Sequence, residues 1–123
     1  PDHVHLIGEV PHDWLFPRMA AVVHHGGAGT TAAGLRAGRP SVICPFMADQ
    51  PFWGRCVQER GCGPAPIPQR RLNAPRLAAA IREAVDNPTH RKRAAAVGAA
   101  LRSEDGVGIA ISRLEQVHRA FAH

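Results

Sequence analysis

The chain has 123 residues, of which 45% are hydrophobic and 20% charged, a composition typical of one soluble globular domain. Its net charge is +5, but the short basic clusters Arg70-Arg71 and Arg91-Lys92-Arg93 have no neighbouring aromatic residues, which argues against nucleic-acid binding. Short, interrupted apolar runs exclude a membrane span, and three cysteines without a C-x-x-C pair argue against a disulfide framework, so we expect a cytoplasmic protein with at most peripheral membrane contact.

The first predicted elements alternate between strands and helices. Residues 3–7 alternate polar and apolar side chains and predict a strand. The apolar run 20–23 predicts a parallel strand that is buried on both faces. Residues 30–37 then predict a helix that stops at Gly38, and residues 41–44 predict a second buried strand.

The later elements are mostly helices. Proline suits the first position of a helix, so we expect one over residues 51–60, and residues 63–66 are expected to form a short extended or edge segment. Asn73 is a good N-cap for a helix with an apolar stripe. Two more helices are expected over residues 88–101 and 106–121. The apolar positions expected to be buried are Leu77, Ile81 and Val85 in the first of these three helices and Val107, Ile111, Leu114 and Phe121 in the last.

This order of strands and helices predicts the fold class. Alternating strands and helices that end in helices alone are typical of an α/β protein with a right-handed, doubly wound parallel sheet. We therefore expect a single Rossmann-like domain over residues 1–123.

A glycine-rich turn connects the apolar run 20–23 with the helix that follows. Its sequence is His24-His25-Gly26-Gly27-Ala28-Gly29-Thr30-Thr31. A strand that ends in such a turn and opens a helix presents backbone N–H groups and a helix N-terminus to an anion. Because ligands bind at the carboxyl ends of the strands in open parallel sheets, this turn predicts a diphosphate site.

A second loop leaves the carboxyl end of the next strand and contains Asp49 and Gln50. Such loops lie on the same edge of a parallel sheet, so we expect this loop to reach the same ligand as the glycine turn. Asp49 offers a charged acceptor, and the amide of Gln50 has both donors and an acceptor, a combination suited to sugar hydroxyls. The two loops together indicate a nucleotide-sugar site. A surface loop in which Asp49 caps the next helix is the alternative.

Other nucleotide and metal sites are less consistent with this pattern. The turn has neither the G-x-G-x-x-G spacing of dinucleotide-binding proteins nor the G-K-[ST] ending of a Walker loop. A zinc site formed by His24, His25 and Asp49 is disfavoured, because adjacent residues at a strand end point to opposite sides. These residues are therefore not expected to bind one zinc ion together.

From Val10 to about Val117 the sequence resembles the C-terminal, donor-binding half of GT-B glycosyltransferases of family 1. It is most similar to the branch that contains sterol glucosyltransferases and glycopeptide-antibiotic glycosyltransferases. The resemblance lies in several blocks in the right order and spacing, which are residues 10–17, 24–31, 35–40 and 45–53.

The resemblance implies roles for individual residues. His24 would contact the donor diphosphate, since an imidazole donor beside a helix end stabilises charge on a leaving nucleotide diphosphate. Asp49 and Gln50 would hold sugar hydroxyls, and no metal or other cofactor is expected. The diphosphate would also meet N–H groups of Gly26, Gly27, Ala28, Gly29 and Thr30, and the nucleobase pocket would be lined by Val10, Pro11 and His12.

The resemblance also implies an activity for the longer protein. An inverting glycosyltransferase would move a hexose, expected to be glucose, from a UDP- or dTDP-sugar to a hydroxyl of a lipophilic acceptor such as a sterol or natural product. The catalytic base and the acceptor pocket would belong to an N-terminal half that this chain lacks, so the chain alone is expected to be inactive. Two alternatives are a non-catalytic nucleotide-sugar-binding or partner module and, with less support, a nucleic-acid-binding module.

Overall fold

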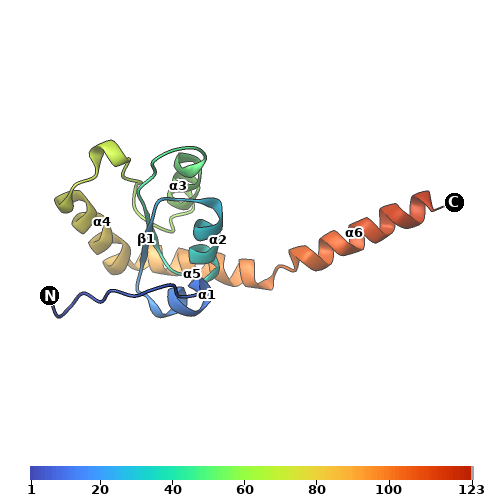
Figure 1. Cartoon of the computed structure of the whole chain (residues 1–123), viewed down its shortest axis with the longest axis horizontal. Coiled ribbons are helices and arrows are strands. Elements are labelled where there is room, and N and C mark those ends of the chain that lie inside the picture. The colour runs from blue at the N-terminus through green and yellow to red at the C-terminus, as the bar shows by residue number, and fades with distance from the viewer. Residues whose placement is uncertain (123) are drawn as a thin grey trace.

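Two short parallel strands lie between helices in the computed structural model, which describes residues 1–122 (Figure 1). Strand β1 pairs with β2 so that Val22 lies opposite Ser41 and His24 opposite Ile43. The elements in chain order are α1 (His12–Leu15), the 3-10 helix η1 (Phe16–Arg18), β1 (Val22–His24), α2 (Ala28–Arg36), β2 (Ser41–Ile43), α3 (Gln50–Glu59), the 3-10 helix η2 (Gln69–Arg71), α4 (Ala74–Asp86), α5 (Pro88–Ser103) and α6 (Gly106–Phe121).

Helices pack on both faces of this sheet. On one face, Ile43 packs with Val57 of α3 and Ala94 of α5. On the other face, Val42 packs with Ala84 of α4. Successive residues of a strand point to opposite faces, so β2 is buried on both sides. This arrangement confirms the predicted α/β fold class with a parallel sheet covered by helices on its two faces.

The predicted edge segment at residues 63–66 runs beside β2 but forms no third strand. The carbonyl of Cys62 accepts a hydrogen bond from the Ser41 N–H at 3.1 Å, and the Ile67 N–H donates to the Ile43 carbonyl at 2.9 Å. A regular ladder between them is prevented because proline has no N–H to donate. Prolines occupy positions 64, 66 and 68.

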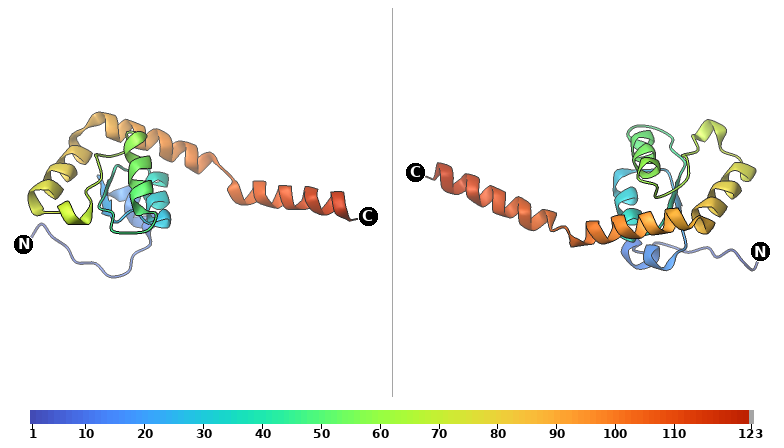
Figure 2. Two further views of the ribbon diagram at one scale, coloured as in Figure 1. Left: turned by 90° about the horizontal axis from the view of Figure 1, so that it is seen from above. Right: turned by 180° about the vertical axis from the view of Figure 1, so that it is seen from behind.

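The prediction of a strand over residues 3–7 is wrong. This segment is irregular and exposed, and the side chain of Leu6 is 98% accessible. Alternation of polar and apolar side chains stabilises a strand only where a neighbouring strand supplies hydrogen bonds and a core covers one face. Neither is present beside residues 3–7 within the described chain (Figure 2).

The predicted helix at residues 51–60 is confirmed as α3, which has proline at one of its first two positions. Asn73 caps α4 as predicted, since its side chain accepts a hydrogen bond from the Arg76 N–H at 2.9 Å. Helix α2 begins at Ala28, two residues before the predicted start, with Gly27 at its N-cap.

The apolar stripe predicted for α4 is only partly correct. Ala80 and Ala84 are the buried residues of this helix, whereas Ile81 is 37% exposed. Leu77 does pack against the buried cluster around Val42. The small side chains face the sheet because α4 approaches it closely, and Ile81 is turned away from it.

Helix α6 does not bury the side chains expected from its periodicity. It projects away from the rest of the molecule in all three views (Figures 1 and 2). Among residues 1–122, no helix is long and apolar enough to cross a membrane. The predicted core positions of α6, which are Val107, Ile111, Leu114 and Phe121, are all exposed.

Candidate functional site

The two loops expected to share a ligand meet at one edge of the sheet. The glycine turn follows β1 and the loop of residues 44–49 follows β2, and the two strands are parallel. Gly26 has a φ of +94°, and a Cβ added to it would lie 2.7 Å from Ile43 Cγ2 and 3.1 Å from the Gln50 carbonyl oxygen. The turn therefore packs directly on the second loop, and only glycine fits at this contact.

Helix α2 begins at the glycine turn with unpaired backbone donors. Gly27 is the N-cap, and no side chain caps the helix. The carbonyl of Gly27 accepts the first helical hydrogen bond, from the Thr31 N–H at 2.9 Å. Within the described residues, the N–H groups of Ala28, Gly29 and Thr30 have no acceptor. These three N–H groups and the positive end of the helix dipole form a cradle for an anion.

The two remaining predicted donors of the turn are already engaged. The Gly26 N–H donates to Nδ1 of His24 at 3.1 Å, and the Gly27 N–H donates to Nδ1 of His25 at 3.4 Å. The geometry thus divides the five predicted N–H groups into two that hold the turn together and three that face outward unpaired.

The two histidines of the turn point in opposite directions. His24 lies on the same strand face as Val22, which is buried. Its Nε2 is fully buried and has no hydrogen-bond partner among residues 1–122. The side chain of His25 is exposed and its ring packs against Gly27. The predicted contact of His24 with the diphosphate stays a prediction, and its Nε2 lies on the inner side of the strand.

The environment of His24 keeps its imidazole neutral. Burial, with smaller contributions from the nearby charges of His25 and His12, lowers the pKa of His24 from its ordinary value of 6.5 to about 4. Because Nδ1 accepts the Gly26 N–H, the ring proton belongs on Nε2.

The second loop is held by its own side chains. Oε1 of Gln50 accepts hydrogen bonds from the N–H groups of Phe46 at 2.8 Å and Met47 at 3.0 Å. Oδ2 of Asp49 accepts from Nε1 of Trp53 at 2.9 Å. Asp49 occupies the N-cap position of α3, but its side chain makes no capping hydrogen bond. Within the described chain, Nε2 of Gln50 and Oδ1 of Asp49 have no protein partner and remain free for a ligand.

The predicted nucleobase residues lie around a separate hollow. Val10 and His12 line a cavity of about 440 Å³, whereas Pro11 is the N-cap of α1 and does not line it. The ring of His12 stacks on Phe16 with the centroids 4.4 Å apart. The other lining residues are Ile7, Gly8, Glu9, Leu15 and Phe16.

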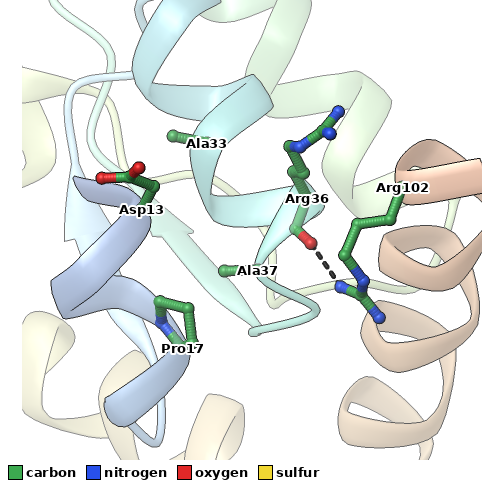
Figure 3. Close-up of a pocket in the computed structure, with 6 residues that line it drawn as sticks. All are labelled: Asp13, Pro17, Ala33, Arg36, Ala37 and Arg102. Carbon is green, nitrogen blue, oxygen red and sulfur yellow. Dashed lines mark hydrogen bonds between the residues drawn. The ribbon is translucent and has the colours of Figure 1, made fainter. Parts of the chain in front are cut away.

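A second cavity, of about 420 Å³, lies at the other end of α2 (Figure 3). It is formed where α1, α2 and α5 meet, and a guanidinium nitrogen of Arg102 donates to the carbonyl of Arg36 beside it. Because Arg36 ends α2 and the glycine turn begins it, this cavity is not part of the anion cradle. Within residues 1–122, no group of three or more His, Cys, Asp or Glu side chains is arranged to hold a metal ion.

Comparison with known proteins identifies the family. The model for "Erythromycin biosynthesis protein CIII-like, C-terminal domain" matches residues 1–113. The chain belongs to this family. It is 52% identical over 110 residues to a sterol 3-beta-glucosyltransferase of Arabidopsis thaliana and 47% identical over 119 residues to one of Yarrowia lipolytica. These matches cover 89% and 97% of the chain but only 17% and 8% of the two relatives.

Solved structures place this EryCIII-like C-terminal domain in the GT-B fold predicted from the sequence. Glycosyltransferase VinC, whose structure is a complex with dTDP, matches with a TM-score of 0.85 and 27% identity. The match covers 98% of the chain and 30% of VinC. The glycosyltransferase of kitacinnamycin matches with a TM-score of 0.81 and 27% identity over 94% of the chain and 30% of its own length. The resemblance to glycosyltransferase C-terminal domains is thereby confirmed.

Proposed function

We propose that this domain binds the nucleotide-sugar donor of an inverting glycosyltransferase. The observation that carries the proposal is the set of three unpaired N–H groups, those of Ala28, Gly29 and Thr30, directly beside the Asp49-Gln50 loop. Three donors at the positive end of a helix suit a diphosphate, and a carboxylate next to an amide suits sugar hydroxyls.

The ring at the outer face of the cradle is that of His25. An exposed imidazole beside the helix N-terminus can donate a hydrogen bond to a diphosphate oxygen and stabilise the charge that grows there as the glycosidic bond breaks. Nδ1 of each histidine accepts an N–H group of the turn, so Nε2 is the nitrogen left to donate, and Nε2 of His24 is buried. His25 is therefore the more accessible donor for a diphosphate oxygen, and the contact of His24 with the diphosphate stays a prediction. Val10 and His12 are proposed to line the base pocket, and no metal or other cofactor is invoked.

The relatives support a donor and acceptor class for the longer protein. Sterol 3-beta-glucosyltransferases at 52% and 47% identity favour glucose as the sugar and a sterol-like hydroxyl as the acceptor. The structural match to a dTDP complex favours a pyrimidine nucleoside diphosphate, so the proposed donors are UDP-glucose and dTDP-glucose. We assign the catalytic base and the acceptor pocket to the part of the protein outside these residues, and expect this chain alone to be inactive.

Calorimetry with UDP, dTDP and uridine tests the donor site. We expect both diphosphates to bind at millimolar concentration and uridine to bind more weakly. His25→Ala should weaken UDP binding by about tenfold, the loss of one charge-assisted hydrogen bond, while uridine binding stays unchanged. His118→Ala, an exposed histidine of α6, is the matched control. Absence of binding by both diphosphates at millimolar ligand would exclude the site, and equal losses for UDP and uridine would exclude the diphosphate contact.

A further inference from the structure

We propose that Trp53 is a positioning residue for the donor sugar, because its indole N–H holds the carboxylate of Asp49 in one orientation. The inference rests on the proposed function, in which Asp49 accepts a hydrogen bond from a sugar hydroxyl. Trp53 acts through Asp49 in this scheme. Its effect is transmitted by one hydrogen bond, of 2.9 Å, from Nε1 of Trp53 to Oδ2 of Asp49.

Each of the two side chains assigned to the sugar is anchored through one of its terminal atoms. Oε1 of Gln50 accepts hydrogen bonds from the N–H groups of Phe46 and Met47, and Nε2 of Gln50 has no partner among the described residues. Oδ2 of Asp49 accepts from the indole of Trp53, and Oδ1 of Asp49 is likewise free there. The loop therefore presents one oriented donor and one oriented acceptor beside the glycine turn.

Within residues 1–122, Trp53 is the one side chain that holds the carboxylate of Asp49. Asp49 is exposed, its side chain does not cap α3, and neither of the two ion pairs found in these residues involves it. An exposed carboxylate without a partner samples several rotamers in water, so the indole N–H selects the orientation. Because the indole is uncharged, it does this without neutralising the negative charge that makes Asp49 a strong acceptor.

The indole of Trp53 is attached to a well-packed part of α3. Trp53 is half-buried, and its backbone N–H donates to the Asp49 carbonyl at 3.2 Å. The next residue, Gly54, is buried, and a Cβ added to it would lie 2.9 Å from Pro66 Cγ. The ring of Phe52 meets the indole edge to face, with the centroids 4.9 Å apart. Since tryptophan has only two side-chain torsions, this packing gives the N–H donor a defined direction.

The first measurement needs no ligand. The chain has two tryptophans, so proton–nitrogen NMR should show two indole N–H signals, and the one that is lost in Trp53→Phe belongs to Trp53. In Asp49→Ala this signal should shift, and its proton should exchange with water about tenfold faster, while the signal of Trp14 stays unchanged. An unchanged Trp53 signal in Asp49→Ala overturns the proposal.

The second measurement compares the affinities for UDP-glucose and UDP by calorimetry. Trp53→Phe removes the N–H donor and keeps an aromatic ring in α3. We expect it to raise the dissociation constant of UDP-glucose about fivefold and to change that of UDP by less than about twofold. Trp14→Phe makes the same change at an exposed tryptophan of α1 and should alter neither. Equal losses for the two ligands would show that Trp53 supports the whole site by packing, which overturns the proposal.

A double-mutant cycle assigns the loss to the hydrogen bond. In the Asp49→Ala background, Trp53→Phe should weaken UDP-glucose binding no further, and a second loss of the same size would overturn the proposal. A wild-type chain that binds neither UDP nor UDP-glucose removes the proposed function and this inference together. Unchanged UDP-glucose binding in Trp53→Phe removes the inference alone.

Discussion

Two adjacent histidines at the end of β1 have different surroundings because a strand turns successive side chains to opposite faces. His24 is packed under α2, and His25 is exposed at the mouth of the cradle. The proximity of the Asp49-Gln50 loop to the turn was predictable, because parallel strands bring their carboxyl ends to one edge. The division of N–H groups within the turn was not, because it depends on ring orientations that the residue types alone do not determine.

Gly26 is the residue whose substitution should be most damaging to the turn. A Cβ at this position clashes with Ile43 Cγ2 at 2.7 Å and requires positive φ. Gly26→Ala should therefore lower the free energy of unfolding by about 1–3 kcal/mol and weaken UDP binding.

Urea unfolding measures the loss of stability in Gly26→Ala, and calorimetry measures the weaker binding of UDP. Gly29→Ala is the matched control for stability, because a Cβ there meets nothing within 4 Å and alanine favours the helix. Equal stability of the two variants would contradict the close packing of Gly26 on the second loop.

The lowered pKa of His24 has a consequence for acid stability. The folded-state pKa of about 4 lies below the ordinary value of 6.5, so the unfolded chain binds more protons between these values. Stability contributed by neutral His24 is complete above about pH 6.5 and is lost as the pH falls towards about 4. The nearby charges of His25 and His12 are the lesser causes of the same lowered pKa of His24.

Urea unfolding of the wild-type chain and of His24→Asn, at about pH 7 and about pH 4.5, checks this consequence. The wild-type chain should lose more stability between the two conditions than the variant, which lacks the titrating ring. Parallel losses in the two proteins would show that the burial of His24 is not linked to proton binding.

At the scale of elements, α5 packs closely on the C-terminal end of α2 and the turn that follows it. A Cβ added to Gly98 of α5 would lie 2.6 Å from Gly38 Cα and 2.8 Å from the Leu35 carbonyl oxygen. The two glycines let the helix backbones approach, which brings Ala94 into the cluster around Ile43. This packing holds the helix that carries the cradle.

Gly98→Ala should therefore destabilise the chain by about 1–3 kcal/mol, although alanine is the better helix former. Thermal unfolding followed by circular dichroism gives the difference. Gly106→Ala, at the start of α6, adds the same methyl group in open space and should leave the midpoint unchanged or raise it slightly. A stabilised Gly98→Ala would mean that the α2–α5 contact is looser than described.

Sequence patterns predicted the helices better than they predicted which side chains of each element pack against the rest of the molecule. The cap at Asn73 and the proline at the start of α3 are local signals, and both were correct. The strand over 3–7 and the buried face of α6 were wrong, because periodicity shows that a segment has an apolar face and does not show what covers it. The apolar stripe of α4 was predicted from its large side chains, but the buried residues of this helix are alanines.

At the scale of the whole molecule, α6 carries its apolar side chains away from the core. Val107 and Phe121 are 74% and 83% exposed. An exposed apolar stripe of this length favours association between molecules. We therefore expect this chain on its own to self-associate at high protein concentration, as measured by sedimentation velocity or light scattering.

The double substitution Ile111→Glu and Leu114→Glu should abolish this association without lowering the unfolding midpoint, because both side chains are exposed in the isolated chain. Ser112→Glu with Gln116→Glu changes the charge of α6 equally and is the control. A monodisperse monomer at all concentrations would refute the prediction.

The prolines beside β2 determine where the sheet can grow. The Ile67 N–H donates to the Ile43 carbonyl of β2 and the Gln69 N–H to the Pro45 carbonyl just after β2, and in an extended chain the alternate residues direct their backbone groups the opposite way. Those outward positions are prolines 64, 66 and 68, so the outer border offers no donors at three successive sites and resists pairing with another strand. Among residues 1–122, the far side of β1 is the border of the sheet that can accept another strand. The domain therefore has a closed border and an open border, and any extension of its sheet proceeds in a single direction.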